Sequence, residues 1–103
     1  MIAEIASEIR THFFSFSGER ISLQTSQRFE GKPLTVTFLQ FRSETGLIIV
    51  IALELSDDKG HSASQDLLME KAEEFESKLM GNNFNDDLVK CLGVLNEALK
   101  EMN

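Results

Sequence analysis

The spacing of apolar residues changes twice along the chain, and each change marks a different kind of element. Near the N-terminus the apolar residues recur at helical spacing, which predicts an amphipathic first helix. Its stripe is Ile2, Ile5, Ile9 and Phe13. The period then falls to two over residues 21–29 and again over residues 34–41, which indicates two half-buried strands. The Glu-Gly-Lys-Pro sequence at residues 30–33 predicts a turn between them.

Residues 47–53 form the most continuous apolar segment, LIIVIAL, between Gly46 and Glu54. A short run rich in β-branched residues is typical of a strand buried on both faces. The run is too short to cross a membrane, which takes about 20 apolar residues. The brief connection at residues 42–46 favours antiparallel pairing with the strand before it. We therefore expect a three-stranded antiparallel sheet that ends with this strand.

Helical spacing returns after a polar loop at residues 57–61. Ser62 and Gln65 have the spacing of a capping box, although Ser64 is an alternative cap, and a second helix is expected to run through residue 79. Gly and Asn residues at 81–83 are typical of a helix end, and a third helix follows. The two stripes are Leu68, Ala72, Phe75 and Leu79, then Leu88, Leu92, Leu95, Leu99 and Met102. The sequence thus predicts one α+β domain over residues 1–103, in the order α-β-β-β-α-α.

Charge is distributed unevenly and narrows the choice of partners. The formal net charge of −7 lies entirely in residues 47–103, because acidic and basic residues balance before them. Nucleic-acid binding requires a basic surface, so we expect no nucleic-acid partner. The chain has one cysteine, Cys91, which excludes an internal disulfide and, with no basic leader after Met1, favours the cytoplasm.

Candidate catalytic and metal-binding residues are few and scattered. Asp57, Asp58 and His61 could gather around a divalent ion, but a solvated loop is the simpler interpretation. His12 lies near the apolar stripe of the first helix, and Cys91 has no histidine near it in sequence to activate it as a nucleophile. The chain contains no glycine-rich phosphate loop. We expect a non-enzymatic protein without a metal or cofactor.

The third strand suggests where a partner would bind. In a three-stranded meander it would be an edge, and an apolar edge without Lys, Pro or a bulge promotes aggregation. We therefore expect that it is not free: either the strand order places it centrally, or it pairs with another chain, giving a homodimer. The candidate interface residues are Leu47, Ile49, Ile51 and Leu53.

The order of elements resembles part of the longin and roadblock families, which have a profilin-like layered architecture. In longin-like proteins the last strand continues into two helices, as the segment from Gly46 through Leu53 and the stripes at residues 68–79 and 88–102 are expected to do. Both families place two strands before the first helix, and here that helix starts almost at Met1. The resemblance implies a shortened relative that acts as a dimerising scaffold, a small-GTPase regulator or a trafficking component. It assigns no functional residue.

An alternative function is a small acidic secretion-type chaperone that holds an extended segment of its partner. The size and acidity of the chain suit it. Such chaperones usually have a further strand among their later helices, and the sequence pattern predicts none here. Co-purification with a GTPase would favour the scaffold, and co-purification with an unfolded secretion substrate would favour the chaperone.

Overall fold

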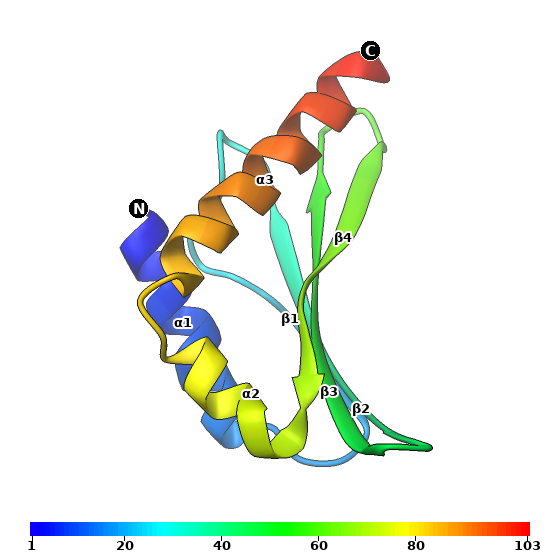
Figure 1. The fold of residues 1–103 in the computed structure, drawn as a ribbon. Helices are drawn as coiled ribbons and strands as arrows, with labels where there is room; N and C mark the ends of the chain where they lie inside the picture. The colour runs from blue at the N-terminus through cyan, green and yellow to red at the C-terminus, as the bar shows by residue number, and fades with distance from the viewer.

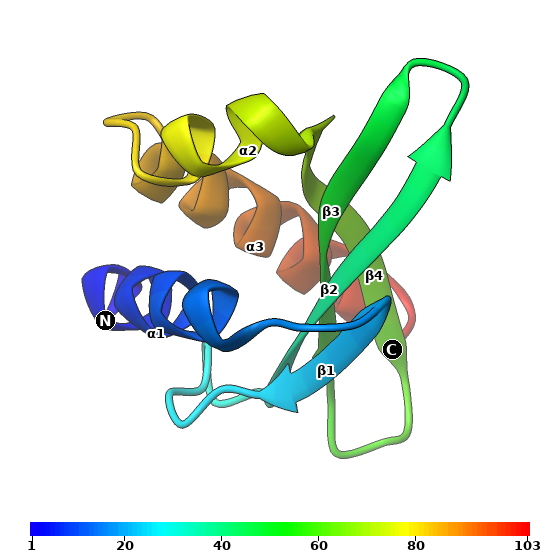
Figure 2. The same cartoon turned by 90° about the horizontal axis from the view of Figure 1, so that it is seen from below.

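The computed structural model describes residues Met1–Asn103 as one sheet covered on one side by helices. The elements are α1 (Ile2–Ser15), β1 (Arg20–Gln24), β2 (Leu34–Ser43), β3 (Gly46–Ser56), β4 (Ser62–Lys71), α2 (Ala72–Leu79) and α3 (Phe84–Glu101). All neighbouring strands are antiparallel, in the order β1-β2-β3-β4. Figures 1 and 2 show the three helices on the same side of the twisted sheet, and no helix covers the other side.

The sheet has four strands, and the predicted three-stranded sheet is therefore wrong. The order is α-β-β-β-β-α-α, because residues 62–71 pair with β3 as β4 instead of beginning the second helix. That helix, α2, contains only Ala72–Leu79. Leu68, which the helical stripe included, is paired with Ile51 in the sheet. The third strand is thus central: it pairs with β2 along one edge and with β4 along the other.

Tertiary pairing explains why a segment of good helix formers becomes a strand. Gln, Leu, Met, Glu and Lys between residues 65 and 71 favour a helix locally. The free edge of β3, however, presents unpaired backbone groups beside a strongly apolar strand, and pairing satisfies them. A bulge in β4, opposite Ile51 and Ala52 of β3, shifts the register by one residue and leaves Leu67 unpaired. Leu67 and Leu68 both pack against the core as a result.

The core lies between the helices and the inner face of the sheet. Side chains alternate along a strand, so β3 contributes Ile49, Ile51, Leu53 and Leu55 to it. The leucines of α3 between residues 88 and 99 are also in the core, as their spacing predicts. Met102 is not, because it lies beyond the end of α3 and is 48% exposed. No helix is long and apolar enough to span a membrane.

Polar contacts fix the helices and the long β1–β2 connection in place. The Arg10 guanidinium of α1 donates to the carbonyl of Leu79 at 3.0 Å and lies over the ring of Phe84, 5.0 Å from its centroid. Lys32 donates to Oδ1 of Asn96 at 2.7 Å, which ties the β1–β2 connection to α3. These contacts hold all three helices on the inner face of the sheet. The outer face is therefore left uncovered by helices.

Candidate interaction surface

The outer face of the sheet has an apolar centre that nothing in the chain covers. We call this surface the open face. Its centre consists of Leu39 and Phe41 of β2, Ile48, Val50 and Ala52 of β3, and Met69 of β4. Phe41 is 45% exposed and Met69 is 53% exposed, whereas Val50 is almost fully buried but lies outside the core cluster. Val50 is therefore covered by its neighbours on the open face and not by the helices.

Strand pleating assigns the residues of β3 to opposite faces. Of the four candidate interface residues, Ile49, Ile51 and Leu53 are buried in the core, and Leu47 is half-buried near the β2–β3 turn. The side chains of the first three therefore have no surface to offer a partner. Ile48, Val50 and Ala52 alternate with them and face outwards. The apolar run was a correct indication of two apolar faces, but its hydrophobicity could not show which face the helices cover.

The strand register arranges the open face in rows. In the central row Leu39 and Val50 are paired, and Val50 is also paired with Met69. Lys71 follows Met69 on one side of this row, beside Ile48, and Asp66 lies on the other side, beside Ala52. Asp66 also lines a depression with Lys90 and Cys91 of α3, so of these two charged residues of β4 the register places only Lys71 at the border of the apolar centre.

Threonine and serine side chains extend the open face away from its apolar centre. Ser22 of β1 and Thr37 of β2 are paired in the register, and their hydroxyl oxygens lie 2.8 Å apart. Thr35 and Glu54 form the next row. A polar border around an apolar centre is typical of a protein-binding surface.

A second, shallower surface lies along α3. A depression of about 680 Å³ is lined by residues of this helix only: Lys90, Gly93, Val94, Glu97, Ala98 and Glu101. Val94 is 57% exposed. A Cβ added at Gly93 would meet no atom within 4 Å, so close packing inside the chain does not explain this glycine.

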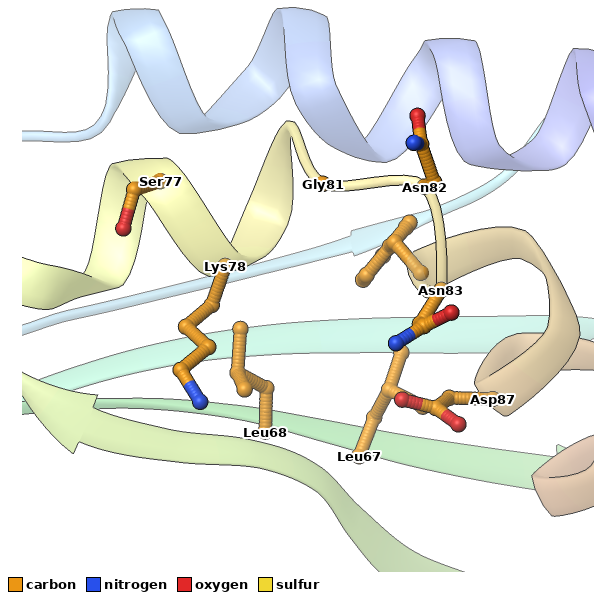
Figure 3. A pocket seen from close by; sticks show the side chains of 9 residues that line it. Leu67, Leu68, Ser77, Lys78, Gly81, Asn82, Asn83 and Asp87 are labelled. Carbon is orange, nitrogen blue, oxygen red and sulfur yellow. The ribbon is translucent and has the colours of Figure 1, made fainter.

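Two further depressions are small or wholly polar. Figure 3 shows one of about 200 Å³ beneath the α2–α3 connection, where Lys78, Asn83 and Asp87 lie around Leu67 and Leu68. The other has no apolar lining and lies between the turn at residues 30–33 and the loop at residues 57–58.

The loop between β3 and β4 is closed by Asp57. Its carboxylate accepts hydrogen bonds from the backbone N–H groups of Lys59 at 3.0 Å and His61 at 2.8 Å, and the His61 ring lies 3.2 Å away. Burial opposes ionisation of Asp57, but these hydrogen bonds outweigh it and lower the pKa of the carboxyl below its ordinary value. The structure contains no group of three or more His, Cys, Asp and Glu side chains placed to hold a metal ion. Asp57 and His61 thus form a loop contact.

Cys91 lies on α3 and is 6% exposed, within the core cluster. Burial, together with the nearby Asp66 carboxylate, raises the pKa of its thiol. A raised pKa disfavours the thiolate, which is the nucleophilic form. His12 lies on α1, half-buried, and is not brought to Cys91 by any hydrogen bond.

Comparisons with protein-family models, curated proteins and solved structures find no match for this chain.

Proposed function

We propose that this chain is a non-enzymatic protein-interaction module that buries the open face against another folded polypeptide. The observation that carries the proposal is the apolar centre of that face. Phe41 and Met69 are about half exposed there, and the register pairs them with Ile48 and Val50, the outward residues of β3. Exposed apolar side chains that are contiguous and bordered by polar groups mark binding surfaces. The buried, poorly ionised Cys91 and the loop role of Asp57 support a function without catalysis.

A dimerising scaffold or small-GTPase regulator is the form of this function that the longin and roadblock resemblance implies. The fourth strand departs from the three strands on which that resemblance depends. The GTPase is therefore proposed as a partner from the resemblance, whereas the binding surface is proposed from this chain's own residues.

A secretion-type chaperone is the second candidate, and β4 is the observation that favours it. It precedes both later helices and is therefore not the strand among them that such chaperones usually have, but its position in the sheet suits an extended partner. It is also a ten-residue strand at the edge of the sheet, with its outer backbone groups unpaired. An extended partner segment can add to such an edge through main-chain hydrogen bonds.

The two candidates and their common premise can be tested with two double variants. Phe41→Lys with Met69→Lys places charge on the open face, and Val89→Lys with Val94→Lys places it on α3, where both valines are also exposed. A purified, folded partner should lose at least about tenfold in affinity with the first variant and little with the second. Binding that the open-face variant leaves unchanged would contradict the proposal. A GTPase as partner would favour the scaffold, and an unfolded secretion substrate the chaperone.

A further inference from the structure

We infer that the occupant of the open face is an amphipathic helix of another protein, which lies along the strands and has acidic side chains on both sides of its apolar stripe. This inference rests on the proposed function and names the kind of partner. The apolar stripe of that helix covers the exposed Phe41 and Met69. Its acidic side chains meet Arg20 and Lys71.

Arg20 and Lys71 border the apolar centre of the open face on its two sides. Arg20 of β1 is paired with Leu39, and Lys71 of β4 is paired with Ile48, so both side chains lie on the outer face of the sheet. Both are exposed, and neither forms an ion pair within the chain. Glu19 precedes Arg20 and is exposed as well, but it makes no ion pair with it. The border thus carries two unpaired cations.

The acidic residues on or beside β3 and β4 do not neutralise this border. Glu70, which precedes Lys71, lies on the inner side, where its carboxylate approaches Lys78 of α2 at 3.9 Å. Glu54 lies on the outer face but two rows beyond the central row, and Asp66 lines the depression beside α3. The chain has a formal net charge of −7, so this border is positive on an otherwise acidic molecule. A positive border of this kind favours a partner with negative charge at the matching positions.

The separation of the two cations fits the width of a helix. They lie on β1 and β4, three strand spacings apart, which is about 14 Å. A helix with its side chains is about 10–12 Å wide, so acidic residues on both of its sides can reach them. Arg20 is in the row of Leu39 and Lys71 in the next row, an offset of about 6.6 Å along the strands. At about 1.5 Å per residue, that offset equals about four residues of a helix.

The same charges argue against two other occupants. A second copy of this chain, placed face to face, brings the same two cations to the border, so the charges do not select it. An anionic lipid surface is bound by clusters of about four to eight basic residues. Arg20 and Lys71 form no such cluster, and the net charge of −7 opposes binding to anionic lipid.

Two stapled peptides test the inference. Each is a four-turn helix with a leucine stripe, locked by a hydrocarbon staple on its solvent side. One has glutamates on both sides of the stripe, about four residues apart, and the other has lysines at the same positions. Fluorescence anisotropy measures binding to the wild type at about 150 mM salt, where charges separated by more than about 8 Å are largely screened. The glutamate peptide should bind at least about tenfold more tightly, although the net charge of the chain favours the lysine peptide.

Charge reversal at the border should invert this preference. Arg20→Glu with Lys71→Glu should weaken binding of the glutamate peptide about tenfold and should bind the lysine peptide more tightly than the wild type does. Lys59→Glu with Lys90→Glu is the matched control, because it changes the net charge equally at two exposed lysines in the β3–β4 loop and on α3. This control should keep the preference for the glutamate peptide.

Phe41→Ala with Met69→Ala should weaken binding of both peptides about tenfold, because both peptides bury these side chains. Thermal unfolding of each variant separates loss of binding from loss of the fold. A wild type that binds neither peptide, or binds the lysine peptide as tightly as the glutamate peptide, overturns the inference. An equal loss of preference in the matched control overturns it as well.

These results would leave the proposed function in place if a folded partner still loses affinity when Phe41 and Met69 are replaced. If no partner responds to those two residues, the proposed function is overturned together with the inference.

Discussion

At the scale of the residue, strand pleating decides what each side chain of β3 can do. Ile51 is fully buried under the helices, whereas its neighbours Val50 and Ala52 face outwards. The seven apolar residues in a row predicted both apolar faces correctly from hydrophobicity alone. Side chains alternate along a strand with a period of two, so a shift of one residue would exchange the residues of the two faces. The helices determine which face is buried, because they cover one side of the sheet. The local sequence of β3 contains no information about which side that is.

Replacing Ile51 by Ala should lower the free energy of unfolding by about 2–5 kcal/mol, because it leaves a cavity in the core. Ile48→Ala, the matched change on the open face, should cost about 1 kcal/mol or less because Ile48 is only half-buried. Urea denaturation at low protein concentration measures both. Equal losses for the two variants would contradict the assignment of faces.

The lowered pKa of Asp57 predicts how the stability of the fold depends on pH. Its pKa is lower in the folded chain than its ordinary value of 3.8, so its contribution to stability is present above that value and is lost as pH falls through the folded pKa. Asp57→Asn should therefore unfold at a lower temperature than wild type near pH 7. The two melting temperatures should converge as the pH falls below the folded pKa, where Asp57 is protonated in both states. A difference independent of pH would show that the charge of Asp57 has no role.

At the scale of the element, the prediction succeeded where local signals and tertiary contacts agree. Helix α1 ends at Ser15, close to the predicted stop near Gly18, which has a positive φ of 84°. Helix α3 begins at Phe84, one residue before the predicted Asn85. The failure was β4: its composition favours a helix, although its partner β3 lies directly before it in the chain, across the loop at residues 57–61. The apolar spacing from Leu68 to Leu79 matches a helix only by coincidence, because Leu68 lies in β4 and the rest of the stripe lies in α2.

Gly93 should be replaceable with a gain in stability. An added Cβ meets nothing within 4 Å, and Gly in a helix interior costs about 1 kcal/mol relative to Ala. Gly93→Ala should therefore raise the melting temperature by about 4–8 °C, measured by circular dichroism. Gly81→Ala is the control, because its Cβ would lie 3.2 Å from the Ser77 carbonyl oxygen and should bring no comparable gain. A lower melting temperature for Gly93→Ala would contradict the open surroundings of this glycine.

At the scale of the whole molecule, the helices cover only one of the two faces that the sheet presents. Four strands and three helices make two layers, with a radius of gyration of 13.7 Å. The inner face is closed by the cluster around Phe38 and Phe75, to which Phe13 and Phe16 add ring contacts. The edge of β3 is closed by β4, so the strand that seemed to require a second chain at its edge has its partner within the chain. The open face retains exposed apolar side chains, of which Phe41 and Met69 are the most exposed.

The distribution of stability should follow this architecture. Amide hydrogens of β3 should exchange most slowly with solvent, because β3 is hydrogen-bonded to β2 and β4 and contributes four side chains to the core. The five-residue β1 and the outer edge of β4 should exchange faster. Hydrogen exchange followed by mass spectrometry measures this order. Faster exchange in β3 than in β4 would contradict the central place of β3.

The sequence by itself determined that this is a small α+β domain with an amphipathic first helix, a third strand apolar on both faces and a leucine-striped last helix. Those features depend on periodicity and local turn chemistry, which neighbouring residues specify. Only the tertiary structure decided that residues 62–71 form a strand, that β3 is central, and that Ile48, Val50 and Met69 face outwards while Ile49 and Ile51 are buried. The physical reason is that strand pairing and coverage of a sheet face are tertiary contacts, whose effect can exceed local propensity; β4 pairs with the strand directly before it, whereas the helices that cover the inner face come from both ends of the chain.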